Sequence, residues 1–223
     1  MTFQRARSEE QREIRRRSIL DTAAAMLEDM PVSELTLNEL SRRVQLAKSA
    51  MLRYFESREA VLLDLLDVAL SRWVAEISTQ LSDGTGRPGS ARERCDRLAA
   101  LVSRSLQQHA TLCDLIAAQS GVLERNVSAE VLLRFKQSTH TSLRMLADAV
   151  RRYIPELDED SFSLCLTMLV TAGALWTNAR PPAGAPALVK ADPSLADLHL
   201  DFSVDLETTL ARLITGTLAR RTS

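Results

Sequence analysis

The chain has 223 residues, of which 45% are hydrophobic and 26% are charged, and its formal net charge is −1. This composition is ordinary for a globular protein with a buried core, and the near-neutral charge excludes the strongly basic character of many nucleic-acid-binding domains. No apolar run approaches the roughly 20 residues of a membrane span, and the charged N-terminus lacks the apolar stretch of a signal peptide, so we expect a cytoplasmic protein.

The three cysteines are odd in number and have no metal-ligand spacing, which predicts buried thiols without a disulfide or a metal site. These residues are Cys95, Cys113 and Cys165. Neither they nor any other motif implies a cofactor.

Basic residues matter by their position rather than by their number. Residues 1–60 carry 11 Lys and Arg against 10 Asp and Glu. A solvated helix face explains such charge runs unless a motif supports another role. The basic residues are Arg5, Arg7, Arg12, Arg15, Arg16, Arg17, Arg42, Arg43, Lys48, Arg53 and Arg58.

The first elements of the chain have a helical period. Gly and Pro number only seven each and cluster at a few points, which favours an all-α protein. A helix is predicted from Glu9 to about Asp29, where Pro31 ends it. Thr36 and Glu39 fit a capping box, in which each side chain binds the other residue's backbone amide, and this predicts a second helix to about residue 44.

A tight connection then leads into a further predicted helix over residues 48–55, which would place Met51, Leu52 and Phe55 on one side. Ser57 is a candidate N-cap for a long fourth helix that continues to about Leu81. The glycine-rich segment over residues 83–90 ends this helix.

The rest of the chain is predicted to be helical with one long loop. The loop runs from Pro181 to Pro193 and contains four prolines, which is typical of a surface segment. The predicted helices cover residues 91–109, 111–124, 128–153, 159–178 and 202–220.

The stretch from Leu35 to Leu66, LTLNELSRRVQLAKSAMLRYFESREAVLLDLL, resembles the N-terminal DNA-binding domain of the TetR family of bacterial repressors. The resemblance rests on a Thr that opens helix two, an acidic-hydrophobic pair within it, a corner, a recognition helix and a Ser-initiated fourth helix. In this chain these are Thr36, Glu39-Leu40, residues 44–47, residues 50–55 and residues 57–61.

Four positions depart from the family pattern. Gln45 replaces the corner glycine, which costs about 1 kcal/mol if its φ is positive. Ala47 replaces the Ser that caps the recognition helix, a cap worth ~1 kcal/mol. Ala50 and Leu52 replace the Thr and Tyr that bind phosphates in relatives.

The resemblance implies a three-helix helix-turn-helix domain over residues 1–56 and a helical effector-binding and dimerisation domain over residues 57–223, joined by the helix at 57–82. Lys48 and Arg53 are the candidates for base contact, because Lys and Arg pair with guanine acceptors in the major groove. The full set of DNA-binding candidates is Thr36, Asn38, Arg42, Arg43, Lys48, Ser49, Arg53, Tyr54 and Arg58.

In the C-terminal part, the resemblance implies that the last two long helices, at 159–178 and 202–220, pair with those of a second subunit in a homodimer with a four-helix interface. The first of them is apolar around much of its circumference, which is compatible with this pairing, and a buried helix within a monomer is the alternative. A small-molecule pocket needs apolar walls with a few polar groups. For each pocket candidate, core packing or surface exposure is the alternative. The candidates are Trp73, His109, Cys113, Gln119, Phe135, His140, Met145, Met168 and Trp176.

The predicted function is a transcriptional regulator that binds double-stranded operator DNA and acts as a repressor released by a small, largely apolar effector. A helical binding or scaffold protein with weak or no DNA binding is an alternative, suggested by Ala47, Ala50 and Leu52. An enzyme is not expected, because no nucleophile, base and orienting group recur at an interpretable spacing. His109, His140 and His199 form no ligand cluster in the sequence.

Overall fold

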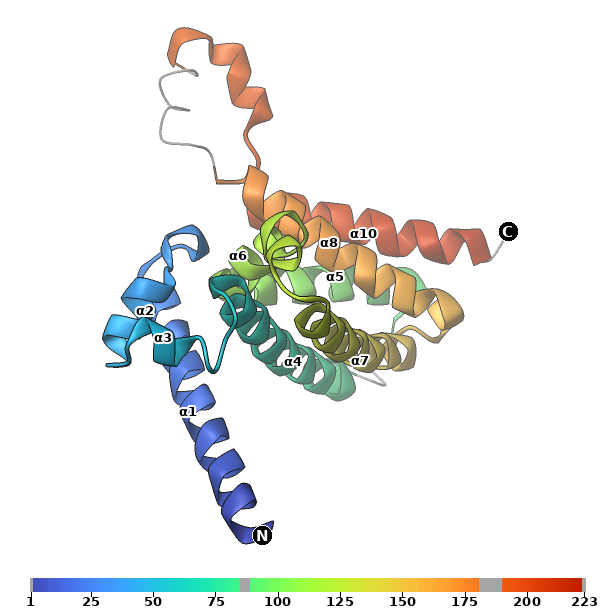
Figure 1. Cartoon of the computed structure of the whole chain (residues 1–223). Coiled ribbons are helices and arrows are strands. Elements are labelled where there is room, and N and C mark those ends of the chain that lie inside the picture. The colour runs from blue at the N-terminus through green and yellow to red at the C-terminus, as the bar shows by residue number, and fades with distance from the viewer. Residues whose placement is uncertain (1, 85–88, 181–189, 222–223) are drawn as a thin grey trace. The chain divides into compact units, whose positions relative to one another are not determined.

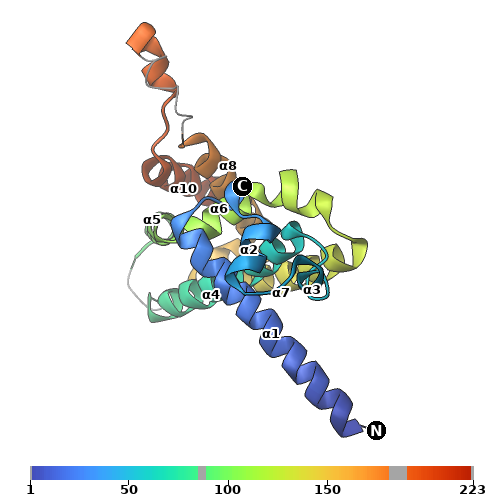
Figure 2. The same cartoon turned by 60° about the vertical axis from the view of Figure 1, so that its left-hand side comes forward.

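A computed structural model describes residues 2–84, 89–180 and 190–221, and every regular element in these ranges is a helix (Figures 1 and 2). The predicted all-α fold, with an N-terminal helix-turn-helix and a helical C-terminal part, is therefore confirmed. The labelled elements are α1 (Thr2–Asp29), η1 (Val32–Glu34), α2 (Leu37–Arg43), α3 (Lys48–Met51), α4 (Arg58–Gly84), α5 (Ala91–Gln108), α6 (Ala110–Ala118), η2 (Gln119–Leu123), η3 (Glu124–Asn126), α7 (Ala129–Tyr153), η4 (Pro155–Asp160), α8 (Ser161–Asn178), η5 (Pro193–Leu198) and α10 (Phe202–Arg221).

The first compact unit comprises Met1–Ala69 together with Ala118–Ser138. Ile19, Ala23 and Met26 lie on one face of α1 at a spacing of three to four residues, and all three are fully buried. Helical periodicity places such residues on the same side of the helix. The buried residues of the same unit also include Leu40 of α2, Met51 of α3, and Leu62 and Leu66 of α4.

The second compact unit comprises Leu70–Ala117 and Thr139–Ser223. In this unit α10 packs against α5 and α8, and it buries Leu206, Leu210 and Ile214, which are four residues apart. The helix α4 crosses from one unit to the other between Ala69 and Leu70. The boundary that we placed at residues 56 and 57 stays a prediction.

Most helix boundaries agree with the sequence analysis. The predicted ends of α5, α7, α8 and α10 lie within two residues of the observed ones. The helix predicted at 111–124 is wrong in its second half, because α6 ends at Ala118 and a π-helical turn follows at Gln119–Leu123. Gly121 in this turn has low helix propensity.

The predicted loop at 181–193 falls largely on residues 181–189, which lie outside the described residues. At its end, Pro193 opens the helix η5, so this part of the prediction is wrong. The side chain of Asp192 accepts a hydrogen bond from the Ser194 amide at 3.0 Å. Proline is well tolerated at the first position of a helix, because the amide hydrogen that it lacks would have no partner within the helix. An Asp cap followed by Pro is therefore a sequence signal for this helix.

Two caps define the start of α4 and α5. The predicted Ser57 cap is confirmed, because the Ala60 amide donates to Ser57 Oγ at 3.1 Å. A full capping box, which the sequence analysis missed, joins Ser90 and Glu93 at the start of α5. The two residues bind each other's backbone amides, and the hydrogen bond from the Ser90 amide lowers the pKa of Glu93.

The apolar interior accounts for the cysteines and for the most hydrophobic helix. Cys95, Cys113 and Cys165 are all buried, as predicted, and burial raises the pKa of both Cys113 and Cys165 to about 12. By length and composition alone Pro155–Asn178 could cross a membrane, which differs from the expectation above. Its helix α8 packs against α10, and this packing explains the apolar composition.

Candidate DNA-binding interface

The start of α2 contains only one of the two hydrogen bonds of the predicted capping box. Thr36 Oγ1 accepts a hydrogen bond from the Glu39 amide at 3.2 Å. The Glu39 carboxylate turns instead to Arg42 at 2.7 Å and to Arg43 at 3.4 Å. The hydrogen bond from Arg42 lowers the pKa of Glu39. The reciprocal half of the prediction is wrong, because two guanidinium groups one turn away compete for the carboxylate.

The corner between α2 and α3 is a Schellman turn with glutamine at the position that glycine usually takes. The Leu46 amide donates to the Ser41 carbonyl at 2.9 Å, and the Gln45 amide donates to the Arg42 carbonyl at 3.2 Å. Gln45 has φ of 54°, in the left-handed region. The corner therefore keeps its hydrogen bonds at the cost of left-handed backbone strain.

Replacing Gln45 by glycine is expected to raise the free energy of unfolding by about 1 kcal/mol, because glycine adopts positive φ without the Cβ clash. Urea unfolding followed by circular dichroism measures the change. The matched control is Gln45→Ala, which keeps a Cβ and should stay near the wild-type value. A glycine variant no more stable than the alanine variant would contradict the strain.

The recognition segment, residues 48–55 after the corner, contains a shorter helix than predicted. α3 covers only Lys48–Met51, and turns continue the chain to Phe55. Its N-cap residue Ala47 makes no side-chain cap, as predicted, because a methyl group cannot accept a hydrogen bond. Met51 and Phe55 are buried as predicted, but Leu52 is 48% exposed, because one residue advances a helix by 100° and turns this side chain toward solvent.

The exposed face of this segment carries the two predicted base-contact residues. Lys48, Ser49 and Arg53 are all exposed. Within the described residues, neither Lys48 nor Arg53 has an ion-pair partner. Two cations without internal partners on one exposed face are free to bind an anion or a base edge.

The predicted positioning residues divide into exposed and engaged side chains. Thr36, Asn38, Arg42 and Arg43 are exposed on α2, and Tyr54 is half-buried. Arg58 differs from them because its guanidinium donates to the Val32 carbonyl at 2.5 Å and is only partly exposed. Arg58 thus joins the start of α4 to η1, and its role toward a phosphate stays a prediction.

Arg16 on α1 is a central residue of this domain that the sequence analysis placed only in a charge run. Its guanidinium lies 4.4 Å from the centroid of the Phe55 ring and donates to the Tyr54 carbonyl at 3.0 Å. It also pairs with Asp64 on α4. Burial raises the pKa of Asp64, and the Arg16 charge acts against that rise. Arg16 thus holds the end of the recognition segment to α1 and α4.

The two residues that follow the recognition segment contact the chain just before α7. Glu56 accepts a hydrogen bond from the Ser128 amide at 2.6 Å, and Ser57 donates to the Asn126 carbonyl at 3.4 Å. The amide hydrogen bond lowers the pKa of Glu56. Local sequence patterns gave no signal for this contact, which joins residues about 70 positions apart.

Three of the predicted effector-binding residues lie together in the second unit. Trp73, His109 and Cys113 gather beside α5, where they bind Ser105 Oγ at 3.0 Å, the Ser105 carbonyl at 2.8 Å and the Leu106 carbonyl at 3.3 Å. The buried Trp176 donates to Asp114 Oδ1 at 2.5 Å and meets Phe202 edge to face.

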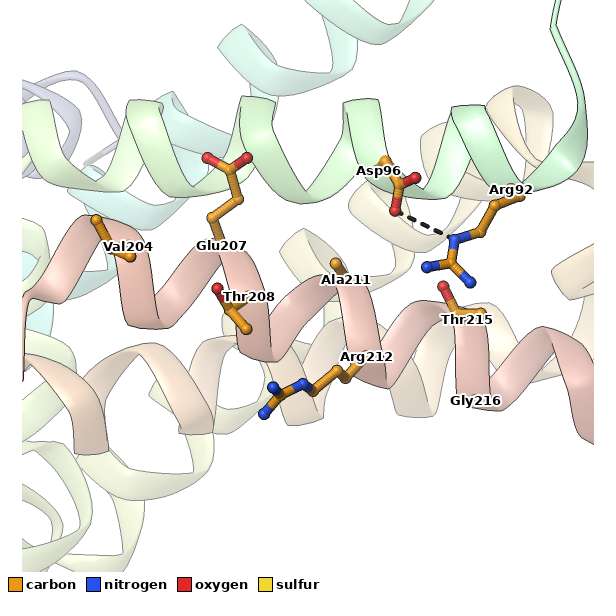
Figure 3. A pocket seen from close by; sticks show the side chains of 9 residues that line it. All are labelled: Arg92, Asp96, Val204, Glu207, Thr208, Ala211, Arg212, Thr215 and Gly216. Atoms are coloured by element: carbon orange, nitrogen blue, oxygen red, sulfur yellow. Dashed lines mark ion pairs between the residues drawn. The ribbon is translucent and has the colours of Figure 1, made fainter.

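The other candidates are scattered over both units. Met168 is buried in the second unit, and Met145 and His140 are exposed there. Gln119 and Phe135 belong to the first unit. A groove of about 750 Å³ in the second unit contains none of the nine candidates (Figure 3). Its lining residues are Arg92, Asp96, Val204, Glu207, Thr208, Ala211, Arg212, Thr215 and Gly216.

Two family profiles match almost the whole chain. Residues 19–65 match the profile described as "Bacterial regulatory proteins, tetR family", and residues 67–221 match "Tetracyclin repressor-like, C-terminal domain". The chain belongs to the TetR family of transcriptional regulators. The TetR-like N-terminal match contains the corner and the recognition segment described above.

Solved structures of other TetR regulators have the same fold. A TetR transcriptional regulator from Rhodococcus sp. RHA1 is similar at a TM-score of 0.57 with 14% identity, over 94% of this chain and 96% of that chain. The fatty acid degradation regulator FadR from Bacillus halodurans has a TM-score of 0.53, 15% identity and coverage of 89% and 97%. FadR from Bacillus subtilis, solved with stearoyl-CoA, has a TM-score of 0.52, 14% identity and coverage of 89% and 97%. The comparison with curated protein sequences found no match.

Proposed function

We propose that this TetR-family protein is a dimeric repressor that binds an operator through the segment from Thr36 to Arg58 and is released by a small molecule. The observation that carries the proposal is the pair of exposed cations, Lys48 and Arg53, on a recognition segment held in place by Arg16. An α-helix of this kind fits the major groove, and flanking cations fix its position on the phosphates.

The test is binding of the purified protein to the DNA upstream of its own coding sequence, measured over a range of salt concentrations. We expect nanomolar affinity that falls steeply as salt increases, because bound cations release counterions from DNA. Equal affinity for this DNA and for a scrambled duplex would overturn the repressor proposal. A helical scaffold protein, which the exposed Leu52 favours, would then be the better assignment.

The dimer is proposed to form through the outer faces of α8 and α10. On α8, Leu166 and Val170 are 45% and 63% exposed and lie one turn apart, and Val204 on α10 is 64% exposed. Figure 3 places Val204, Thr208, Ala211 and Thr215 along the groove face of α10. Exposed apolar side chains at helical spacing are typical of a two-fold helical interface.

Leu166→Glu with Val170→Glu is expected to convert the dimer to a monomer, because two buried charges would face the same charges of the partner across a two-fold axis. Light scattering after size exclusion measures the mass. The control Leu133→Glu changes an exposed leucine of the first unit and should leave the dimer intact. A wild-type monomer at micromolar concentration would contradict the dimer.

The proposed effector is a largely apolar small molecule. Because the FadR structure from Bacillus subtilis contains stearoyl-CoA, long-chain acyl-CoA thioesters are suitable first probes, with coenzyme A alone as the control. A probe that binds the regulator should raise its melting temperature and lower its affinity for the operator. If no acyl chain length has either effect, this effector class is rejected.

Effector release needs a connection from the C-terminal part to the recognition segment. The chain leaves the second unit at Ala117, contributes residues 118–138 to the first unit and then returns. Within the first unit, Glu56 and Ser128 join this excursion to the turn after α3. A shift of the α6–α7 connection would therefore pull on the recognition segment.

Glu56→Ala is expected to leave operator affinity within about threefold of wild type, because Glu56 is exposed and its carboxylate is engaged by the Ser128 amide at the start of α7. The same variant should reduce the effect of the effector on DNA binding, since coupling free energies are typically 1–3 kcal/mol and need a physical connection. Titration of the operator complex with the active acyl-CoA measures this. Glu130→Ala, at an exposed site nearby, is the control.

A further inference from the structure

A second basic groove lies beside the recognition segment, and we infer that it binds the DNA phosphate backbone outside the base-contact surface. This α1 groove is formed by one side of α1 and by the turn after α3. No acidic side chain lines it, and its volume is about 1060 Å³. Its lining residues are Gln11, Arg12, Ile14, Arg15, Ser18, Arg53 and Tyr54.

The α1 groove contains three guanidinium groups. Arg12 is fixed in place, because its Nη2 donates to the Arg53 carbonyl at 3.0 Å. Arg15 and Arg53 are exposed and have no ion-pair partner among the described residues. Like charges that line one groove repel each other, and a bound polyanion relieves that repulsion. The charge of the groove thus complements phosphates.

The groove is continuous with the proposed base-contact surface. Arg53 belongs to both, and Tyr54 is the next residue along the chain. A duplex bound against Lys48 and Arg53 would therefore continue along α1. This continuity favours duplex DNA over a free nucleotide or a lipid headgroup as the occupant, and the inference rests on the proposed DNA-binding function.

An apolar residue in the groove suits the sugars of the same backbone. Ile14 is 63% exposed although its neighbours on α1 are charged. A branched aliphatic side chain between arginines can contact deoxyribose carbons while the guanidinium groups bind the adjacent phosphate oxygens. These contacts go to sugar and phosphate, so they carry no base sequence.

The chain offers a matched pair of variants to test this assignment. Arg15→Ala removes a charge from the groove, and Arg17→Ala removes the same charge from an exposed α1 position that does not line the groove. Both side chains are exposed, so both variants should fold, which circular dichroism checks. Arg15→Lys keeps the charge and should retain binding close to wild type.

Affinity is measured for the operator and for a scrambled duplex of equal length, each over a salt series. For Arg15→Ala we expect the slope of log affinity against log salt to become less steep by about 0.9 for each subunit bound, the contribution of one phosphate contact. The affinity for both duplexes should fall by the same factor, since the contact carries no sequence information. Arg17→Ala should leave the slope and both affinities unchanged.

The outcomes separate the groove from the proposed function. If wild type binds neither duplex, the DNA-binding function itself fails. If wild type binds but Arg15→Ala keeps the full slope, the groove assignment is overturned. Equal losses from Arg15→Ala and Arg17→Ala would assign the effect to overall charge and also overturn it, and a loss on the operator alone would make Arg15 a base contact.

Discussion

Replacing Arg16 by alanine is expected to lower the free energy of unfolding by about 2–3 kcal/mol, because a mostly buried carboxylate at Asp64 then loses its cation. The variant also loses the hydrogen bond to the Tyr54 carbonyl and the contact with the Phe55 ring. Urea unfolding at pH 7 measures the change. Arg17→Ala, one position along α1 and exposed, should stay within about 0.5 kcal/mol of wild type.

The same variant has a predictable pH dependence. Burial already raises the pKa of Asp64 in the folded protein, and removal of Arg16 removes a charge that lowers it. The pKa of Asp64 in the folded variant is therefore higher still. A raised carboxyl pKa stabilises the folded state at low pH. This stabilisation is lost as the pH rises through that pKa. The stability deficit of Arg16→Ala should thus be largest near pH 7 and shrink toward pH 4.

A double variant isolates this titration. In Arg16→Ala with Asp64→Asn no carboxyl remains at position 64, so the deficit relative to wild type should not shrink between pH 7 and pH 4, because only wild type, and not this double variant, has the raised pKa of Asp64 that favours its folded state at low pH. If Arg16→Ala alone shows a constant deficit over that range, Asp64 does not bind its proton more tightly after the guanidinium is removed, and the explanation by burial is wrong.

The second large effect concerns sequence recognition. Lys48→Ala with Arg53→Ala is expected to weaken operator binding by about 100-fold or more, since a good base contact contributes about 1–3 kcal/mol of discrimination. Affinity for a scrambled duplex should fall much less, so the preference for the operator should nearly vanish. Fluorescence anisotropy with both duplexes at one salt concentration measures the two affinities.

The control for this variant removes two equal charges elsewhere. Arg72 and Arg104 are exposed in the second unit, and their double alanine variant should keep the operator preference of wild type. A Lys48 and Arg53 double variant that still prefers the operator would show that other residues read the bases. It would also favour a recognition surface centred on α2.

The helices and the corner could be predicted because their signals are local. Apolar residues at three- and four-residue spacing identify the helices. The TetR resemblance places Gln45 at a corner that usually carries glycine, which predicts strain if φ is positive, and the observed φ is 54°. The short length of α3 could not be predicted, because the turn after Met51 depends on the burial of Phe55 and on the contact of its ring with Arg16 of α1 rather than on local propensity.

Arg16 shows how a charged residue on a buried face is missed. The spacing of Ile19, Ala23 and Met26 continues backward to position 16, but the charge in a run of three arginines favoured a solvated face. A buried carboxylate on another helix decides its environment, and that partner is 48 residues away. The effector-pocket residues stay a prediction, since pocket walls and core packing need the same apolar side chains and the sequence does not distinguish them.

Gly173 sets the distance between two helices of the second unit. A Cβ at this position would lie 2.9 Å from Ile116 Cγ2 and 3.4 Å from the Ala117 backbone nitrogen, so the Ile116 side chain and the backbone of α6 pack directly against α8 here. Such close packing leaves little space into which either helix could shift alone. A displacement of α6 would therefore be transmitted to α8, whose outer face carries Leu166 and Val170.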